Sequence, residues 1–180
     1  MMETVNIGRW TLEIDREATE LAFSRIPLGS PETCECDYCK NFVAARDHAY
    51  PPEAREMFAT LGIDYQKEAE TWEWYRVESG DHSYGGFFHC VGSITGGTES
   101  VQWQDDMGTY HLERIGEYFE YGFRSGGDLV EEPFKGQPLF QLDFTTLVPW
   151  VIDTPDPDES FAKRRTLLTK LREWLIKRVR

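Results

Sequence analysis

Alternating apolar and polar residues predict that the second half of the chain is built from β-strands. From Thr71 onward, four stretches combine aromatic and β-branched residues with a period of two, and Gly, Asp or Ser bounds them. These stretches are residues 71–78, 83–94, 109–125 and 139–152. The last alternates most regularly, with one face made of Phe140, Leu142, Phe144, Thr146 and Val148. The third changes parity near Gly116, which indicates a bulge or a turn there.

A further strand is predicted near the N-terminus, at residues 4–15. Its apolar residues change parity at Gly8, and a β-bulge at this glycine reconciles the two halves. Two other segments, residues 96–108 and 125–138, predict long loops of the kind that often carry function.

Helical signals precede the strand region. Ser30 and Pro31 offer an N-cap and a proline at the first helical position, and residues 32–48 are expected to follow as one helix. Residues 51–60 open with prolines and are followed by Leu-Gly, which is typical of a short helix with a glycine stop. A third short helix is expected to begin at Asp64.

The C-terminal segment, residues 158–180, has helical periodicity. Apolar residues recur at spacings of three and four, at Phe161, Leu168, Leu171, Leu175 and Val179. Eight basic residues against three acidic ones make this segment basic, whereas the rest of the chain is strongly acidic. We expect a basic amphipathic helix docked on the acidic body. A membrane-surface helix is disfavoured, because anionic lipid would repel that body.

Together these elements predict an α+β protein. Strands joined by short turns and flanked by helices at both ends are typical of an antiparallel sheet. We expect a single domain over residues 1–180. It has a curved antiparallel sheet drawn from residues 4–15 and 71–152, N-terminal helices over one edge, and the C-terminal amphipathic helix.

Composition and charge narrow the class of protein. The chain has 180 residues, enough for one sizeable core, and 40% hydrophobic with 14% aromatic residues exclude a disordered chain. A formal net charge of -13 excludes nucleic acid as a partner, because phosphates would be repelled. The same charge favours a basic protein partner or a small cationic ligand.

Two absences bear on the compartment. No stretch approaches the ~20 apolar residues that span a bilayer, so no membrane segment is expected. The first residues have neither a basic n-region nor an apolar h-region. Four cysteines without such a signal are typical of reduced thiols. We therefore expect a cytoplasmic protein.

Three of the four cysteines fall within the stretch TCECDYC, residues 33–39. In a helix, Cys36 and Cys39 share a face, whereas Cys34 lies about 200° around from Cys36 at ~3.6 residues per turn. The three thiols can converge only if the chain is irregular over 33–36 and the helix begins at about Cys36. A zinc knuckle has this geometry, with thiolates at a helix start.

A structural zinc site needs a fourth ligand. Cys90 is the candidate, and His89, His48, His82 and His111 are the reserves. The predicted site is thus Cys34, Cys36, Cys39 and Cys90 around a structural zinc ion. Two alternatives stay open. The CDYC stretch is a C-x-x-C at a helix start, which is typical of a redox pair, and all four cysteines also suit small buried apolar positions.

The stretch C-x-C-x-x-C-K-N-F, followed by a proline-opened helix and LGID at 61–64, resembles a family of uncharacterised bacterial proteins. The resemblance spans residues 33 to 95 and ends with YGGFFHCVG. It implies a bacterial cytosolic protein and carries no activity.

Aromatic residues gather in the strand region and suggest a binding surface. Trp72, Trp74, Tyr84 and Trp103 are its candidate residues, and the competing interpretation is an aromatic core. Trp103 lies in a polar context and is the best candidate for a surface anchor.

These observations favour a non-enzymatic, acidic binding protein, for example an inhibitor or immunity-type protein that covers a basic partner. The alternative is a small enzyme or a thiol-redox protein. It would use the Cys36/Cys39 pair or the His111 region, where Glu113 on the same strand face could orient the imidazole.

Overall fold

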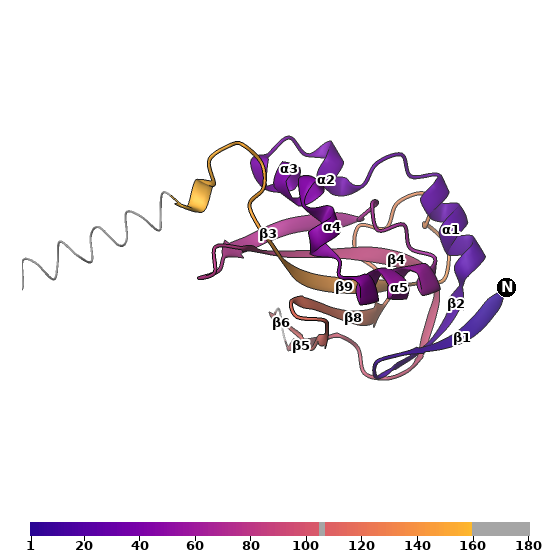
Figure 1. Ribbon diagram of the computed structural model, residues 1–180. Helices are drawn as coiled ribbons and strands as arrows, with labels where there is room; N and C mark the ends of the chain where they lie inside the picture. Colours follow the sequence, from indigo (N-terminus) through magenta and orange to yellow (C-terminus); the bar gives the residue numbers. More distant parts are fainter. Residues whose placement is uncertain (105–106, 160–180) are drawn as a thin grey trace, which may run out of the picture.

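One long strand organises the sheet of the computed structural model, which describes residues 1–104 and 107–159 (Figure 1). β4 (His82–Gly96) pairs along one edge with β9 (Leu139–Val148). Its other edge pairs first with β3 (Glu70–Arg76) and then with β2 (Trp10–Asp15).

Three further strands complete a seven-stranded sheet: β1 (Met2–Ile7), β7 (Glu113–Ile115) and β8 (Phe119–Ser125). The strand order is β1-β2-β4-β9-β8-β7, with β3 also beside β4. All of these pairings are antiparallel and the sheet is not closed, so the predicted α+β class with an antiparallel sheet is confirmed.

Gly92 marks the point at which β4 meets β2. Its φ is +149°, and a Cβ atom there would lie 2.1 Å from the carbonyl oxygen of Glu13 in β2. Only glycine permits so close an approach of two backbones. This residue therefore allows β4 to pair first with β3 and then with β2 along the same edge.

The N-terminal strand prediction was wrong in one respect. Residues 2–15 form two strands, β1 and β2, joined by a two-residue turn at Gly8 and Arg9. Gly8 has φ +54°, which suits the first position of a tight hairpin turn. A turn and a bulge both reverse the parity of side chains, so the alternation alone does not distinguish them.

The helices lie together on one side of the sheet (Figure 1). They are α1 (Arg16–Ser24), α2 (Ser30–Thr33), α3 (Asp37–Ala44), α4 (Arg46–Ala49) and α5 (Pro52–Leu61). The single helix expected over 32–48 is wrong, because the chain breaks into α2, α3 and α4. The helix expected at Asp64 is also wrong. A turn forms there, with the Asp64 carboxylate accepting from the Gln66 N–H.

Two other predictions hold, and one does not. α5 ends at Leu61 and is capped by the predicted glycine stop, Gly62, which is left-handed with φ +75°. The parity change near Gly116 is a turn between β7 and β8. The expected loop over 96–108 instead contains β5 (Val101–Gln104), which pairs with β6 (Met107–Tyr110). The tail helix was predicted over residues 158–180, and residues 160–180 of it lie outside the described residues.

The core between the helices and the sheet is aromatic. The predicted apolar face of β9 is buried against it, and Thr146 in that face donates to the carbonyl oxygen of Ala49 in α4 at 2.7 Å. Tyr50 is surrounded by rings from both layers, namely Phe42, Phe58, Phe88, Phe119 and Phe144. Aromatic pairs of this kind fix the helices on the sheet.

Candidate metal centre

The three neighbouring cysteines converge at the start of α3. α2 ends at Thr33, Cys34 is extended with φ -95° and ψ 133°, and Cys36 is the N-cap of α3. The Sγ atoms of Cys34 and Cys36 lie 3.3 Å apart, and the Cys36 Sγ accepts from the Cys39 N–H at 3.4 Å. This is the irregular segment and helix start on which convergence of the thiols depended.

All three Sγ atoms lie within 4.8 Å of one another, with Cys34 and Cys36 exposed and Cys39 half-buried. Zinc–sulfur bonds of 2.3 Å in a tetrahedral site place sulfur atoms about 3.8 Å apart. The observed spacing therefore suits three thiolates around one ion.

The surroundings act differently on the three thiols. The backbone N–H of Cys36 lowers the pKa of Cys34, and the neighbouring thiols lower it further. Burial raises the pKa of Cys39, with a smaller contribution from hydrogen bonding to Cys34. Between Cys34 and Cys39, Cys34 is consequently the thiol that loses its proton more readily.

Cys90 does not join the cluster, and its assignment as the fourth ligand is corrected. It lies on β4 opposite Phe140 and is fully buried in the core, where burial alone raises its pKa. Within the described residues, no histidine or carboxylate shares the 4.8 Å cluster either. Cys90 packs as a small apolar side chain, as one of the alternative interpretations held.

The predicted aromatic residues separate into different environments. Trp72 and Trp74 pack edge to face with ring centroids 5.5 Å apart, above Gly85. Tyr84 is 1% exposed and donates to the Tyr38 carbonyl oxygen at 2.9 Å, so it belongs to the core rather than to a surface. Trp103 lies on β5 opposite Gly108 rather than in a loop.

The histidine–carboxylate arrangement proposed at His111 has other contacts. His111 precedes β7 instead of lying on a strand, and its side chain is exposed. The Glu113 carboxylate lies 3.7 Å from Arg9 and accepts from the Tyr121 hydroxyl at 3.5 Å. These contacts anchor the N-terminal hairpin and do not orient the His111 imidazole.

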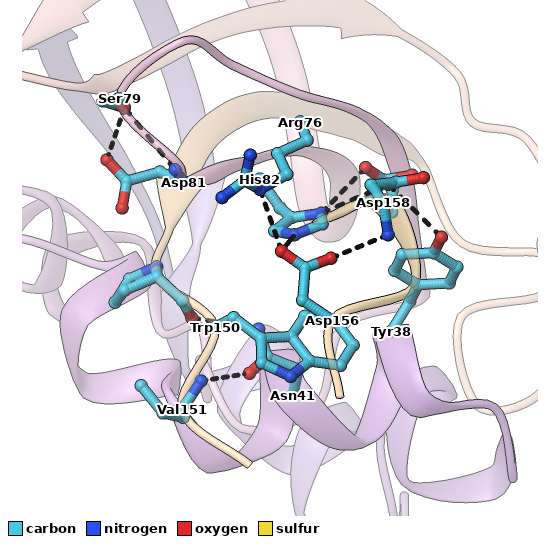
Figure 2. A network of polar contacts seen from close by, with 12 residues as sticks. Tyr38, Asn41, Arg76, Ser79, Asp81, His82, Trp150, Val151, Asp156 and Asp158 are labelled. Carbon is cyan, nitrogen blue, oxygen red and sulfur yellow. Dashed lines mark hydrogen bonds and ion pairs between the residues drawn. The ribbon is translucent and has the colours of Figure 1, made fainter. Parts of the chain in front are cut away.

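A second polar cluster centres on His82, whose ring packs against Tyr38 in the first turn of α3 (Figure 2). The His82 side chain is 0% exposed, with Nδ1 3.1 Å from Glu73 and 3.8 Å from Asp158. Asp156 Oδ2 lies 3.3 Å from His82 Nε2 and 2.8 Å from Arg76 Nε. His82 Nε2 and Arg76 Nε both face Asp156, but neither is aligned for a hydrogen bond. These two contacts are therefore ion pairs without a hydrogen bond.

Opposing influences act on the carboxylates of this cluster. Burial raises the pKa of Glu73, although His82 opposes the shift. Burial also acts on Asp156, but the Asp158 N–H, His82 and Arg76 outweigh it and lower the pKa. No motif in the sequence indicates this cluster. Glu73, Asp156 and Asp158 are three of 32 acidic residues, and two of them follow the strand region in a proline-rich turn.

Comparison with models of protein families, with curated proteins and with solved structures finds no match for this chain. The resemblance of the cysteine stretch to bacterial proteins therefore stays an expectation. Within the described residues, no helix is long and apolar enough to cross a membrane.

Proposed function

We propose that this protein binds a thiophilic metal ion through Cys34, Cys36 and Cys39, and that the ion is zinc. The observation that carries the proposal is the convergence of three Sγ atoms within 4.8 Å at the first turn of a helix. Backbone N–H groups at a helix start favour negative charge on sulfur, and thiolates select soft or borderline ions such as zinc.

Among the described residues, the proposed site has three ligands and no fourth. All four cysteines and all four histidines of the chain are among the described residues, and only three cysteines cluster. Water or a donor from another molecule then completes the tetrahedron. This arrangement differs from the closed four-ligand structural site that the sequence predicted.

Metal titration tests this proposal. Reduced protein is titrated with Co²⁺, whose thiolate charge-transfer absorption reports sulfur ligands, and then with Zn²⁺ in competition. We expect about one ion per chain in the wild type, as for a single zinc site. The same is expected for Cys90→Ser, and no thiolate absorption for the triple variant Cys34→Ser/Cys36→Ser/Cys39→Ser.

Two results would contradict the proposal. One is loss of the metal in Cys90→Ser. The other is reduced wild-type protein that binds no ion and forms a Cys34–Cys36 disulfide with a mild oxidant, which would favour the redox alternative, with Cys34 rather than Cys39 as the partner of Cys36.

A second function, non-enzymatic binding of a basic partner, is favoured by the outer strand β3. Among the described strands β3 pairs with β4 alone, and a register shift between Glu73 and Tyr75 brings two consecutive aromatics to the surface. Trp74 is 52% and Tyr75 62% exposed. Exposed aromatics on an acidic protein suit an inhibitor or immunity-type contact with a basic surface.

This second proposal is tested by measuring how well the protein is retained on a defined set of immobilised basic proteins, at low and at high salt. Retention of the wild type should fall with salt, because screening weakens the charge attraction. The double variant Trp74→Ala/Tyr75→Ala should bind more weakly at both salt concentrations, although its net charge is unchanged. Equal retention of the wild type and the variant would remove β3 from the interface.

A further inference from the structure

α3 connects the cysteine cluster to the chain segment that follows the sheet. Cys36 caps this helix and Cys39 lies in its first turn. Tyr38 and Asn41, three residues apart and so on a common face, contact residues 149–158 (Figure 2). These two cysteines and the residues that contact segment 149–158 therefore all lie within positions 36–41 of the chain.

Asn41 holds the beginning of the segment. Its side chain is fully buried, and its amide nitrogen donates to the Pro149 carbonyl oxygen at 3.0 Å. Its amide oxygen accepts from the Val151 N–H at 2.7 Å. One side chain thus provides hydrogen-bond partners for two backbone groups that lie just beyond the end of β9.

Tyr38 holds the end of the segment. Its hydroxyl donates to Asp158 at 3.3 Å, and its ring packs against Trp150 and His82 with centroids 5.9 Å away in both cases. Burial, followed by the charges of Asp158 and Glu73, raises the pKa of Tyr38 to about 12, so the hydroxyl keeps its proton near neutrality. Asp156, Asp158, His82 and Arg76 complete the attachment.

We infer that occupancy of the cysteine site by zinc controls how firmly residues 149–158 are held. This inference rests on the function proposed above. An ion shared by Cys34, Cys36 and Cys39 cross-links the residues on both sides of the α3 start, and so restricts the turn that carries Tyr38 and the helix that carries Asn41. Without the ion, the first turn of α3 is held by the Lys40 N–H bond to the Cys36 carbonyl oxygen at 3.1 Å and by the weak bond from the Cys39 N–H to the Cys36 sulfur at 3.4 Å.

Hydrogen exchange measured by mass spectrometry, with and without zinc, tests the inference on the full chain. We expect zinc to slow exchange in peptides covering 149–158 at least about threefold, including the Val151 amide, in the wild type and in Cys90→Ser. Cys36→Ser should show no such slowing. Serine is itself a good N-cap, so this variant keeps the helix start while losing a soft ligand.

The outcomes separate the two proposals. If one zinc binds per chain and exchange over 149–158 is unchanged, the coupling is wrong and the metal site stands. If no zinc binds, both are wrong. Slowing spread evenly over the whole chain would also contradict the coupling, because it would report general stabilisation.

Linkage gives a reciprocal test. If zinc strengthens the attachment, then weakening the attachment must weaken zinc binding by the same factor. Tyr38→Phe removes one hydrogen bond to Asp158 and should raise the zinc dissociation constant roughly twofold to fivefold. Tyr118→Phe, which removes a hydroxyl donor to the His48 carbonyl oxygen, is the matched control and should leave it unchanged.

Discussion

Burial of a single carboxyl group, that of Glu68, links stability to pH. Its side chain is fully buried, and it accepts from the Arg46 guanidinium at 3.0 Å and from the Tyr50 hydroxyl at 2.8 Å. Burial is the largest influence and raises the pKa of Glu68 from 4.5 to about 7, although Arg46 opposes it. The folded protein therefore keeps a proton that the unfolded chain has already lost, so this group lowers the unfolding free energy as pH rises from about 4.5 to about 7.

We expect Glu68→Gln to remove that contribution, because the amide does not titrate. Urea unfolding of the wild type and the variant at about pH 4.5 and about pH 7.5 would measure it. The fall in unfolding free energy between the two pH values should be smaller in the variant. Glu53→Gln, which alters an exposed residue of α5, is the control and should keep the wild-type dependence. Identical pH dependence in Glu68→Gln and the wild type would contradict the expectation.

At the scale of elements, one amide side chain of α3, that of Asn41, holds the chain that follows β9. Asn41 replaces the strand partner that residues 149–151 lose when β9 ends at Val148. The amide group of this helix residue thus donates to one backbone group and accepts from another, as a neighbouring strand would. Removing it leaves buried or half-buried backbone groups without partners, which is the costly case.

Asn41→Ala should lower the unfolding free energy by about 2–3 kcal/mol, from two lost hydrogen bonds and the stranded Pro149 and Val151 groups. Denaturant titration measures this change. Asn6→Ala is the matched control, because Asn6 is exposed and its amide oxygen accepts only from the Thr11 hydroxyl among the contacts described. A loss for Asn41→Ala as small as that of the control would show that water replaces the side chain.

The sequence predicted those elements whose signal is local. The alternation in residues 139–152 identified β9 and its buried face, and the Leu-Gly stop identified the end of α5. The spacing of Cys34, Cys36 and Cys39 predicted the condition under which their thiols meet. The pairing of Cys90 with Phe140, and the approach of Asp156 and Asp158 to His82, depend on chain segments distant in the sequence. No short pattern encodes such contacts, so the fourth ligand was wrong and the His82 cluster was missed.

At the scale of the whole molecule, the net charge of -13 opposes the compact state. Ion pairs such as Arg46–Glu32 and Arg124–Asp143 offset part of the repulsion locally. Most carboxylates face solvent, where salt screens their mutual repulsion.

Raising sodium chloride from about 0.02 M to about 0.5 M should therefore raise the melting temperature, by about 2–5 °C. Thermal unfolding followed by circular dichroism would measure the shift. The variant Glu53→Lys/Glu56→Lys, which reverses two exposed charges on α5, should show a smaller shift. A melting temperature that falls with salt would mean that surface ion pairs outweigh net repulsion.

The central position of β4 also has a consequence for synthesis on the ribosome. β4 pairs with β2, which is made early, and along its other edge with β9, which ends only at Val148. Until that residue has left the exit tunnel, the edge of β4 that pairs with β9 lacks a strand neighbour, and the nascent chain exposes an unpaired hydrophobic strand. Long-range pairing of this kind folds slowly. Translation that pauses before the codons of β9 would therefore prolong the period in which the chain is prone to aggregate.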